Sequence, residues 1–131
     1  MIKIISYLCL CVWVLTSCDT MRRINMKNNS ADTVHVTWTT VEDSIGFNPF
    51  VLSNSKELHF ALAPACKEVK MSFGTGNWTA EYLQHLMKYL VSLEITSPRQ
   101  QIMLTTPQQI SAYLLSRRKA LNKRIDLVFT P

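Results

Sequence analysis

Short segments in which apolar and polar residues alternate recur along this chain and point to a β protein. The clearest covers residues 33–39, where Val34, Val36 and Trp38 alternate with threonine and histidine. Because successive side chains of a strand point to opposite faces, each such segment is expected to bury one face. The pattern predicts antiparallel strands whose sheet has one wet face. Similar segments begin near residue 23 and cover 58–62, 69–73, 90–96, 101–104 and 125–129.

Two segments have the period of a helix instead. Asn77 or Thr79 is expected to cap a helix that runs to about Tyr89, which places apolar side chains on one face and polar side chains on the other. A second helix is expected to begin at Thr106 and Pro107, because threonine suits the cap and proline the first helical position. Apolar residues continue at helical spacing as far as Leu121, so we expect this helix to run to about Lys119.

A strand over residues 113–115 is the competing interpretation of the second helix. In either case the pattern predicts a mainly β fold with minor α content, of the α+β class. Its architecture would be an antiparallel sheet or a small sandwich with one or two short helices.

The N-terminus has a different character from the rest of the chain. Lys3 precedes an apolar run from Ile4 to Leu15, and Thr16-Ser17-Cys18 follows. The run is too short for a membrane-spanning helix, which needs about 20 apolar residues. Its length and flanks are typical of a secretory signal peptide. An ordinary cleaved signal peptide and a buried strand are the alternatives.

The tetrapeptide Leu15-Thr16-Ser17-Cys18 resembles a lipobox, the site at which bacterial lipoproteins are lipidated on cysteine and cleaved just before it. The resemblance implies that Cys18 carries a diacylglycerol thioether and an acyl chain such as palmitate. It also implies a signal peptide over residues 1–17, a lipidated N-terminus and tether over 18–30, and a single mostly β domain over 31–131.

The order of elements is similar to that of small envelope lipoproteins of the Bacteroidota. The segment Ile24–Ser30, which leads into a valine-rich strand, and the ending Phe129-Thr130-Pro131 carry this resemblance. It implies a lipid-anchored location in the cell envelope, which we expect to be the outer membrane, on its periplasmic or its surface face. Nucleic acid is not an expected partner there.

One tripeptide pattern occurs three times, with aspartate first, a hydroxyl residue second and an aliphatic residue third. It resembles the O-glycosylation acceptor motif of Bacteroidota envelope proteins, which implies Thr20, Thr33 and Ser44 as acceptors. The alternative is turn and cap chemistry, in which aspartate followed by serine or threonine is common.

Basic residues exceed acidic ones, for a net charge of +5. Such an excess favours anionic surfaces, for example lipid headgroups or acidic polysaccharide. The alternative for the densest group is that cations near a helix C-terminus are stabilised by the helix dipole. The candidate residues for binding an anionic ligand or partner are Arg117, Arg118, Lys119, Lys123 and Arg124.

Residues with catalytic or metal-binding potential are scattered. His35 and His59 lie on predicted polar strand faces and are expected to be neighbours, but a zinc site would need a third ligand. Gly74-Thr75-Gly76 lacks the remaining residues of a nucleotide-binding loop. Cys66 would be the one cysteine left without lipid in the mature chain, which suits a buried small residue. We therefore expect no catalytic residue, metal or cofactor.

The sequence is best interpreted as a lipid-anchored envelope protein with a non-catalytic binding or scaffolding role, whose ligand is another envelope protein or a glycan. One alternative is a small envelope hydrolase or metal-dependent enzyme, for which His35 and His59 would have to meet Glu57 or Asp43 in one cleft. Another alternative is an inhibitor or immunity-type protein that meets an acidic partner through its basic residues.

Overall fold

The computed structural model describes residues 21–41, 57–65, 68–119 and 121–131. In chain order within these residues, four strands precede the first α-helix, two strands separate it from the second, and two more strands follow. Their bounds are β1 (Met21–Asn28), β2 (Val34–Thr40), β3 (Glu57–Leu62), β4 (Val69–Thr75), α2 (Ala80–Leu86), the 3-10 helix η1 (Met87–Tyr89), β5 (Leu90–Ser97), β6 (Gln100–Leu104), α3 (Pro107–Leu115), β7 (Arg118–Lys119) and β8 (Arg124–Phe129).

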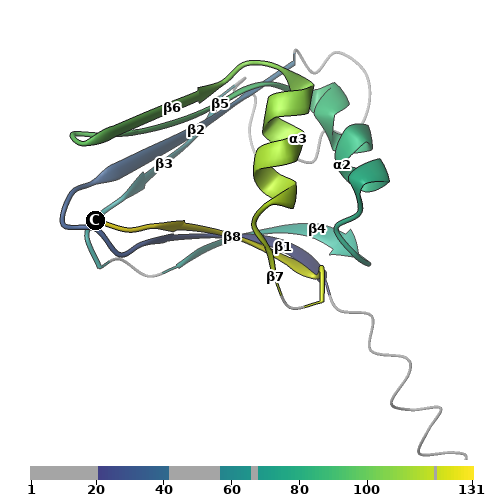
Figure 1. Ribbon diagram of the computed structural model, residues 1–131, viewed down its shortest axis with the longest axis horizontal. Helices are drawn as coiled ribbons and strands as arrows, with labels where there is room; N and C mark the ends of the chain where they lie inside the picture. The colour runs from purple at the N-terminus through teal and green to yellow at the C-terminus, as the bar shows by residue number, and fades with distance from the viewer. Residues whose placement is uncertain (1–20, 42–56, 66–67, 120) are drawn as a thin grey trace, which may run out of the picture.

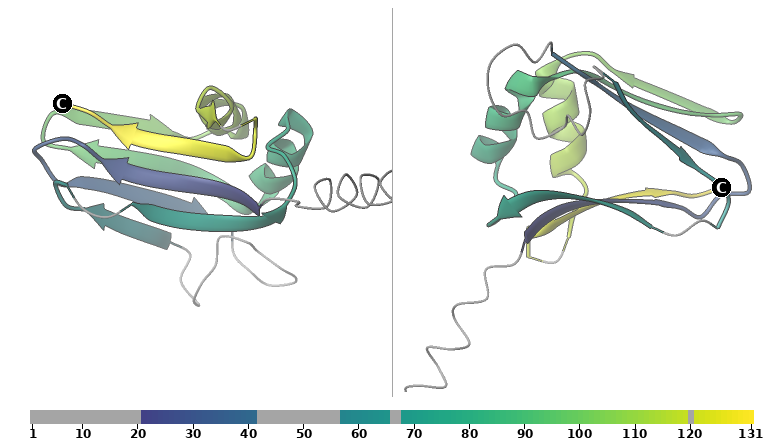
Figure 2. Two further views of the ribbon diagram at one scale, coloured as in Figure 1. Left: turned by 90° about the horizontal axis from the view of Figure 1, so that it is seen from below. Right: turned by 180° about the vertical axis from the view of Figure 1, so that it is seen from behind.

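The strands form two four-stranded sheets that face each other. Sheet A has the order β4-β1-β8-β7 and sheet B the order β3-β2-β5-β6. The sheets lie close together at one end, the closed end, and diverge toward the other, the open end, where α2 and α3 fill the space between them (Figures 1 and 2). The predicted fold class, a mainly β protein with two short helices in a small sandwich, is confirmed.

Sheet A contains one pairing that the alternating pattern did not predict. β1 and β8 are parallel, with Ile24 opposite Ile125 and Met26 opposite Leu127. The other pairings in both sheets are antiparallel. The alternation of apolar and polar residues shows which side chains face the core, but it does not show the direction of a strand. The expectation of an antiparallel sheet therefore missed this one parallel pair.

The core lies between the two sheets and continues under the helices. Trp38 is fully buried, as its apolar strand face predicted, and Trp78 before α2 is fully buried too. Each sheet presents its alternating apolar residues to this space. Other fully buried residues are Ile24, Met26, Val36, Leu83, Leu93, Ile110, Leu114, Ile125 and Leu127.

Both helices begin where the sequence predicted. The Thr79 hydroxyl accepts from the Tyr82 backbone N–H, and the Thr106 hydroxyl accepts from the Gln109 backbone N–H. These bonds satisfy amide groups that have no partner inside the helix. Pro107 follows at the first position of α3, where its missing N–H costs nothing.

The end of α3 differs from the prediction. The helix ends at Leu115 with Ser116 as its C-cap, so the expected continuation to Lys119 is wrong, as is the alternative strand over 113–115. Leu121 does not continue the apolar face of the helix: it lies in the turn after β7 and is 91% exposed. The helical spacing of Leu121 therefore does not indicate a helix, because the chain has already left α3 at this point.

The folded domain begins earlier than the boundary expected at residue 31. Residues 21–28 form β1, a central strand of sheet A that buries Ile24 and Met26. Several predictions fall on residues outside the described part of the chain: Cys18, Thr20, Asp43, Ser44 and Cys66.

Candidate functional site

The predicted basic residues lie partly at the end of α3 and partly on the β7–β8 hairpin. Arg117 directly follows the C-cap Ser116, and Arg118 Nε donates to the Leu115 carbonyl over 3.3 Å, so the alternative of cations at a helix C-terminus applies to these two residues. These residues differ in the contacts that their side chains make. Arg118 donates from Nη1 to the Trp78 carbonyl over 3.1 Å, and Arg124 forms an ion pair with Asp126 over 2.7 Å. The ammonium groups of Lys119 and Lys123 have no hydrogen bond or ion pair within the described residues. The five basic residues therefore do not act as one patch.

The Arg117 side chain contacts residues at the end of α3. Its guanidinium carbon lies 4.0 Å from the centroid of the Tyr113 ring, and Nη1 donates to the Ser116 hydroxyl over 3.1 Å. Burial raises the pKa of the Tyr113 hydroxyl, while the charge and hydrogen bond of Arg117 oppose this rise without cancelling it. Tyr113 is therefore uncharged at neutral pH, and the cation rests against a neutral ring.

The predicted proximity of the two strand histidines is confirmed. His35 Nδ1 and His59 Nε2 are 3.3 Å apart, and the Thr37 hydroxyl lies 2.9 Å from His59 Nδ1. All three side chains are on the outer face of sheet B, where Glu57 lies two residues along β3 from His59. Among the residues that the structure describes, no group of three or more His, Cys, Asp and Glu side chains could hold a metal ion.

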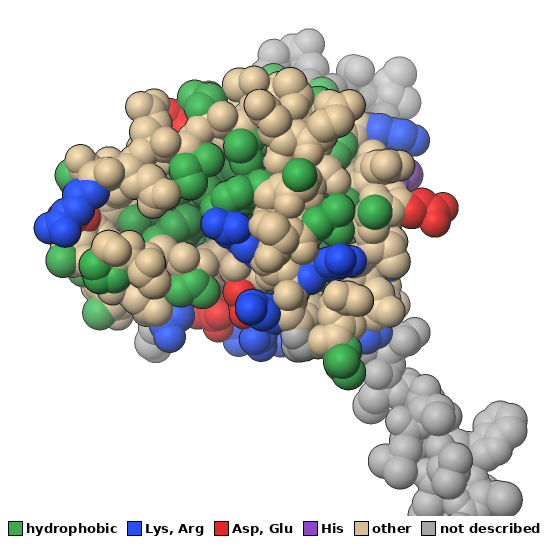
Figure 3. All heavy atoms as spheres, viewed as in Figure 1, with side chains coloured by type: hydrophobic (Ala, Val, Ile, Leu, Met, Phe, Trp, Pro, Cys, Tyr) green, Lys and Arg blue, Asp and Glu red, His purple; other side chains and the backbone are tan. Residues whose placement is uncertain are grey.

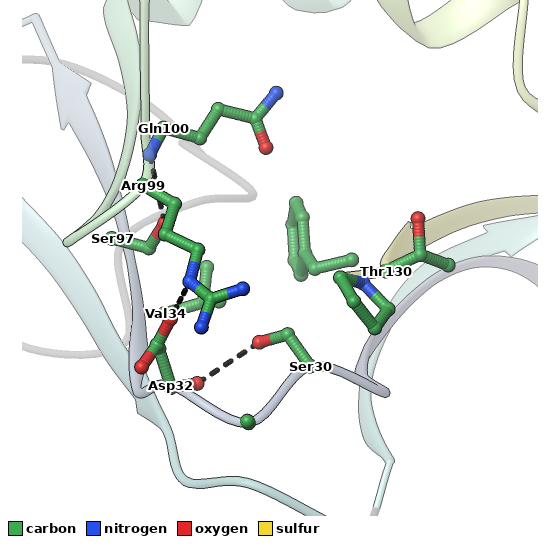
Figure 4. Close-up of a pocket in the computed structure, with 10 residues that line it drawn as sticks. Ser30, Asp32, Val34, Ser97, Arg99, Gln100 and Thr130 are labelled. Atoms are coloured by element: carbon green, nitrogen blue, oxygen red, sulfur yellow. Dashed lines mark hydrogen bonds and ion pairs between the residues drawn. The ribbon is translucent and has the colours of Figure 1, made fainter.

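A pocket at the closed end was not predicted from the sequence. Its volume is about 420 Å³, and three segments that are distant in the sequence form it: the β1–β2 turn with the start of β2, the β5–β6 turn, and the end of β8 with the residues after it (Figure 4). No local motif signals such a site, because each segment contributes only three or four residues to the lining. The pocket is lined by Ser30, Ala31, Asp32, Val34, Ser97, Arg99, Gln100, Phe129, Thr130 and Pro131.

The polar side of this pocket is built around an ion pair between two turns. Arg99 extends from the β5–β6 turn, and its Nε lies 3.1 Å from Asp32 Oδ2 in the β1–β2 turn (Figure 4). Gln100 follows Arg99, and its backbone N–H donates to the Ser97 hydroxyl over 3.1 Å. Phe129 supplies an apolar wall and is itself almost fully buried. The pocket therefore offers donors, acceptors and an aromatic surface together.

Asn28 holds the turn that carries Asp32. Its Nδ2 donates to the carbonyls of Asp32 over 2.7 Å and of Leu62 over 2.8 Å. Its Oδ1 accepts from the Ser30 backbone N–H over 2.9 Å and from the Ser30 hydroxyl over 2.6 Å. Because the side chain is fully buried and every polar atom has a partner, the turn is fixed before any ligand arrives.

Thr33, the described member of the three predicted glycosylation sites, is exposed directly before β2. Its neighbours have structural roles, since Asp32 pairs with Arg99 and Val34 belongs to the core. The tripeptide is thus partly accounted for by turn and core contacts. The acceptor role of Thr33 stays a prediction, as do those of Thr20 and Ser44.

Other hollows carry fewer converging polar groups. One of about 350 Å³ lies between β4 and α2, where Arg22 rests 3.7 Å from the Tyr82 ring centroid and donates to the Phe73 carbonyl. Another of about 510 Å³ lies between α2 and α3. Hydrophobic side chains also show in the hollow between the edges of the two sheets, beside α3 (Figure 3). The closed-end pocket is the better candidate because an ion pair and an aromatic wall meet there.

None of the described helices combines the length and the hydrophobicity that crossing a bilayer requires. A scan against protein-family models finds no match, and neither do searches of curated proteins and of solved structures.

Proposed function

We propose that this chain is a lipid-anchored protein of the cell envelope that binds rather than catalyses, and that its closed-end pocket takes a neutral, hydroxyl-rich saccharide unit. The position of the pocket carries the proposal. It lies at the closed end, whereas β1 begins at the open end (Figure 1). The 8 residues of β1 separate the two by about 25 Å. An anchor at Cys18 would hold the pocket away from the membrane.

The chemistry of the pocket favours a sugar over an ion. Arg99 and Asp32 neutralise each other, so the pocket gives little net attraction to a charged ligand. Both groups still present donors and acceptors to the pocket, Asp32 partly buried and Arg99 exposed, which suits vicinal hydroxyls. Phe129 is almost fully buried and adds only an apolar edge beside Pro131. The volume falls within the range of about 300–1,000 Å³ that is common for small-molecule pockets.

Replacing Arg99 with alanine should weaken saccharide binding at least tenfold, which corresponds to about 1.4 kcal/mol. The reason is that Asp32 then loses both its partner and its fixed orientation. Titration calorimetry against a panel of neutral mono- and disaccharides measures the effect. Lys70→Ala is the control, since it removes the same charge from the outer face of sheet A. No binding by the wild type, or equal binding by Arg99→Ala, would contradict the proposal.

The anchor has its own test. Cys18→Ala should move the protein from the membrane fraction to the soluble fraction, or leave the uncut precursor, because no thioether can form. Two or three acyl chains attach a protein stably, whereas one alone is marginal. Cell fractionation with size analysis measures the outcome. A variant that still fractionates with membranes at the mature size would disprove lipidation at Cys18.

A further inference from the structure

The turn between β7 and β8 exposes a leucine to water. Leu121 is 91% exposed, more than any other large hydrophobic residue in the part of the chain that the structure describes. Both Leu121 and Asn122 have left-handed backbone conformations, with φ of 55° and 64°, as tight hairpin turns require. The Asn122 carbonyl accepts from the Trp78 backbone N–H over 2.6 Å, so contacts inside the fold account for the backbone of the turn. They do not account for a leucine at its tip, because asparagine and glycine are the residues that such turns favour.

Basic side chains surround this leucine. Lys119 and Lys123 flank the turn, and Arg124 begins β8. Arg23 lies opposite Arg124 in the parallel register of β1 and β8, and its backbone N–H donates to the Lys123 carbonyl over 3.2 Å. Arg124 is paired with Asp126, which leaves Lys119 and Lys123 as the cations of the turn without an ion pair among the described residues. Cations around an exposed leucine suit a partner whose surface is anionic outside and apolar beneath.

The start of β1 lies beside this turn. Met21 is 46% exposed and opens the strand that pairs with β8. The β7–β8 turn and the first residues of β1 are found at the same corner of the open end (Figures 1 and 2). Cys18 precedes Met21 by three residues, which span at most about 10 Å. An acyl chain on Cys18 would therefore bring the turn to the level of the headgroups.

We infer that the β7–β8 tip, defined as Lys119, Leu121 and Lys123, docks on anionic lipid headgroups of the membrane that holds the anchor. This inference rests on the lipid anchor of the proposed function. Leu121 enters the boundary between headgroups and acyl chains, and the two lysines bind phosphates around it. Each basic residue near an anionic surface contributes about fivefold to partitioning. A second contact point fixes the orientation of the domain, with the pocket facing away from the membrane.

The test uses the mature chain from Cys18 onward with Cys18→Ser, so that no lipid is attached. All described strands and helices lie within this range. The protein is sedimented with vesicles of phosphatidylcholine alone or with about one third phosphatidylglycerol. We expect binding to the anionic vesicles and little to the neutral ones. Lys119→Glu with Lys123→Glu should weaken binding at least tenfold, and Leu121→Ser should weaken it about fivefold.

The control pair is Lys27→Glu with Lys70→Glu, which changes the net charge by the same amount on the exposed outer face of sheet A. Binding of this pair should remain within twofold of the original. Equal losses in both pairs would show general charge attraction and overturn the inference. So would full binding by Leu121→Ser, or equal capture by soluble dextran sulfate. Because the tested chain has no lipid, failure here leaves the fractionation result for Cys18 unaffected.

Discussion

Trp78→Ala should lower the free energy of unfolding by about 3–5 kcal/mol, the usual cost of removing a buried aromatic side chain. The indole is fully buried and meets Phe73 and Tyr82 edge-on. Its N–H donates to the Arg23 carbonyl over 3.1 Å. The residue therefore connects α2 to β1 through its side chain, and a cavity there would separate the helix from sheet A.

Urea unfolding followed by circular dichroism measures this change. Trp78→Phe keeps most of the ring and loses the N–H, so it should cost about 1–2 kcal/mol because the Arg23 carbonyl is left without its donor. Val91→Ala, at a residue that is 48% exposed, should stay within about 0.5 kcal/mol. A loss for Trp78→Ala that matched this surface control would contradict the position of Trp78 in the core.

Asn28→Ala should also be severe, with a loss of about 3–4 kcal/mol. The substitution leaves the buried carbonyls of Asp32 and Leu62 without their donor and the Ser30 N–H without its acceptor. Each buried group that is left without a hydrogen bond lowers the stability by about 1–3 kcal/mol, and partial access of water to these groups reduces the sum. The same variant should lose saccharide binding, because Asp32 is no longer held opposite Arg99.

Two neighbours serve as controls for Asn28. Asn29→Ala makes the same change one residue on, at an exposed side chain, and should cost less than about 0.5 kcal/mol. Ser30→Ala removes one hydroxyl from the network and should cost about 0.5–1.5 kcal/mol. Thermal and urea unfolding rank the three variants. A ranking in which Asn28→Ala resembled Asn29→Ala would mean that the turn does not depend on the buried amide.

The sequence was informative wherever one face of an element is buried. Alternation identified β2 through Val34, Val36 and Trp38, and cap chemistry placed the starts of α2 and α3 at Thr79 and Thr106. These features follow from local geometry, so they need no knowledge of the partner elements. For the same reason, alternation predicted that His35 and His59 share a polar face, where their ring nitrogens lie 3.3 Å apart.

The sequence did not predict features that depend on contacts between distant segments of the chain. The parallel pairing of β1 with β8 leaves no mark in the alternation of either strand. The closed-end pocket joins Asp32 to Arg99 from two turns that are distant in the sequence, and no motif signals this contact. Leu121 illustrates a different error. Its spacing matched the apolar face of the second helix, but the hairpin turn exposes its side chain. Spacing describes a face only while the element continues.

The parallel pair at the centre of sheet A has a consequence for biosynthesis. β1 is made first and β8 last, so the middle of this sheet cannot close until nearly the whole chain has been synthesised. Until then β1 has β4 on one side and an open edge on the other, beside the apolar side chains of Ile24 and Met26. Contacts between such distant segments form slowly, and unpaired edges promote aggregation. A chain exported in the unfolded state would therefore depend on chaperones until its last strand arrives.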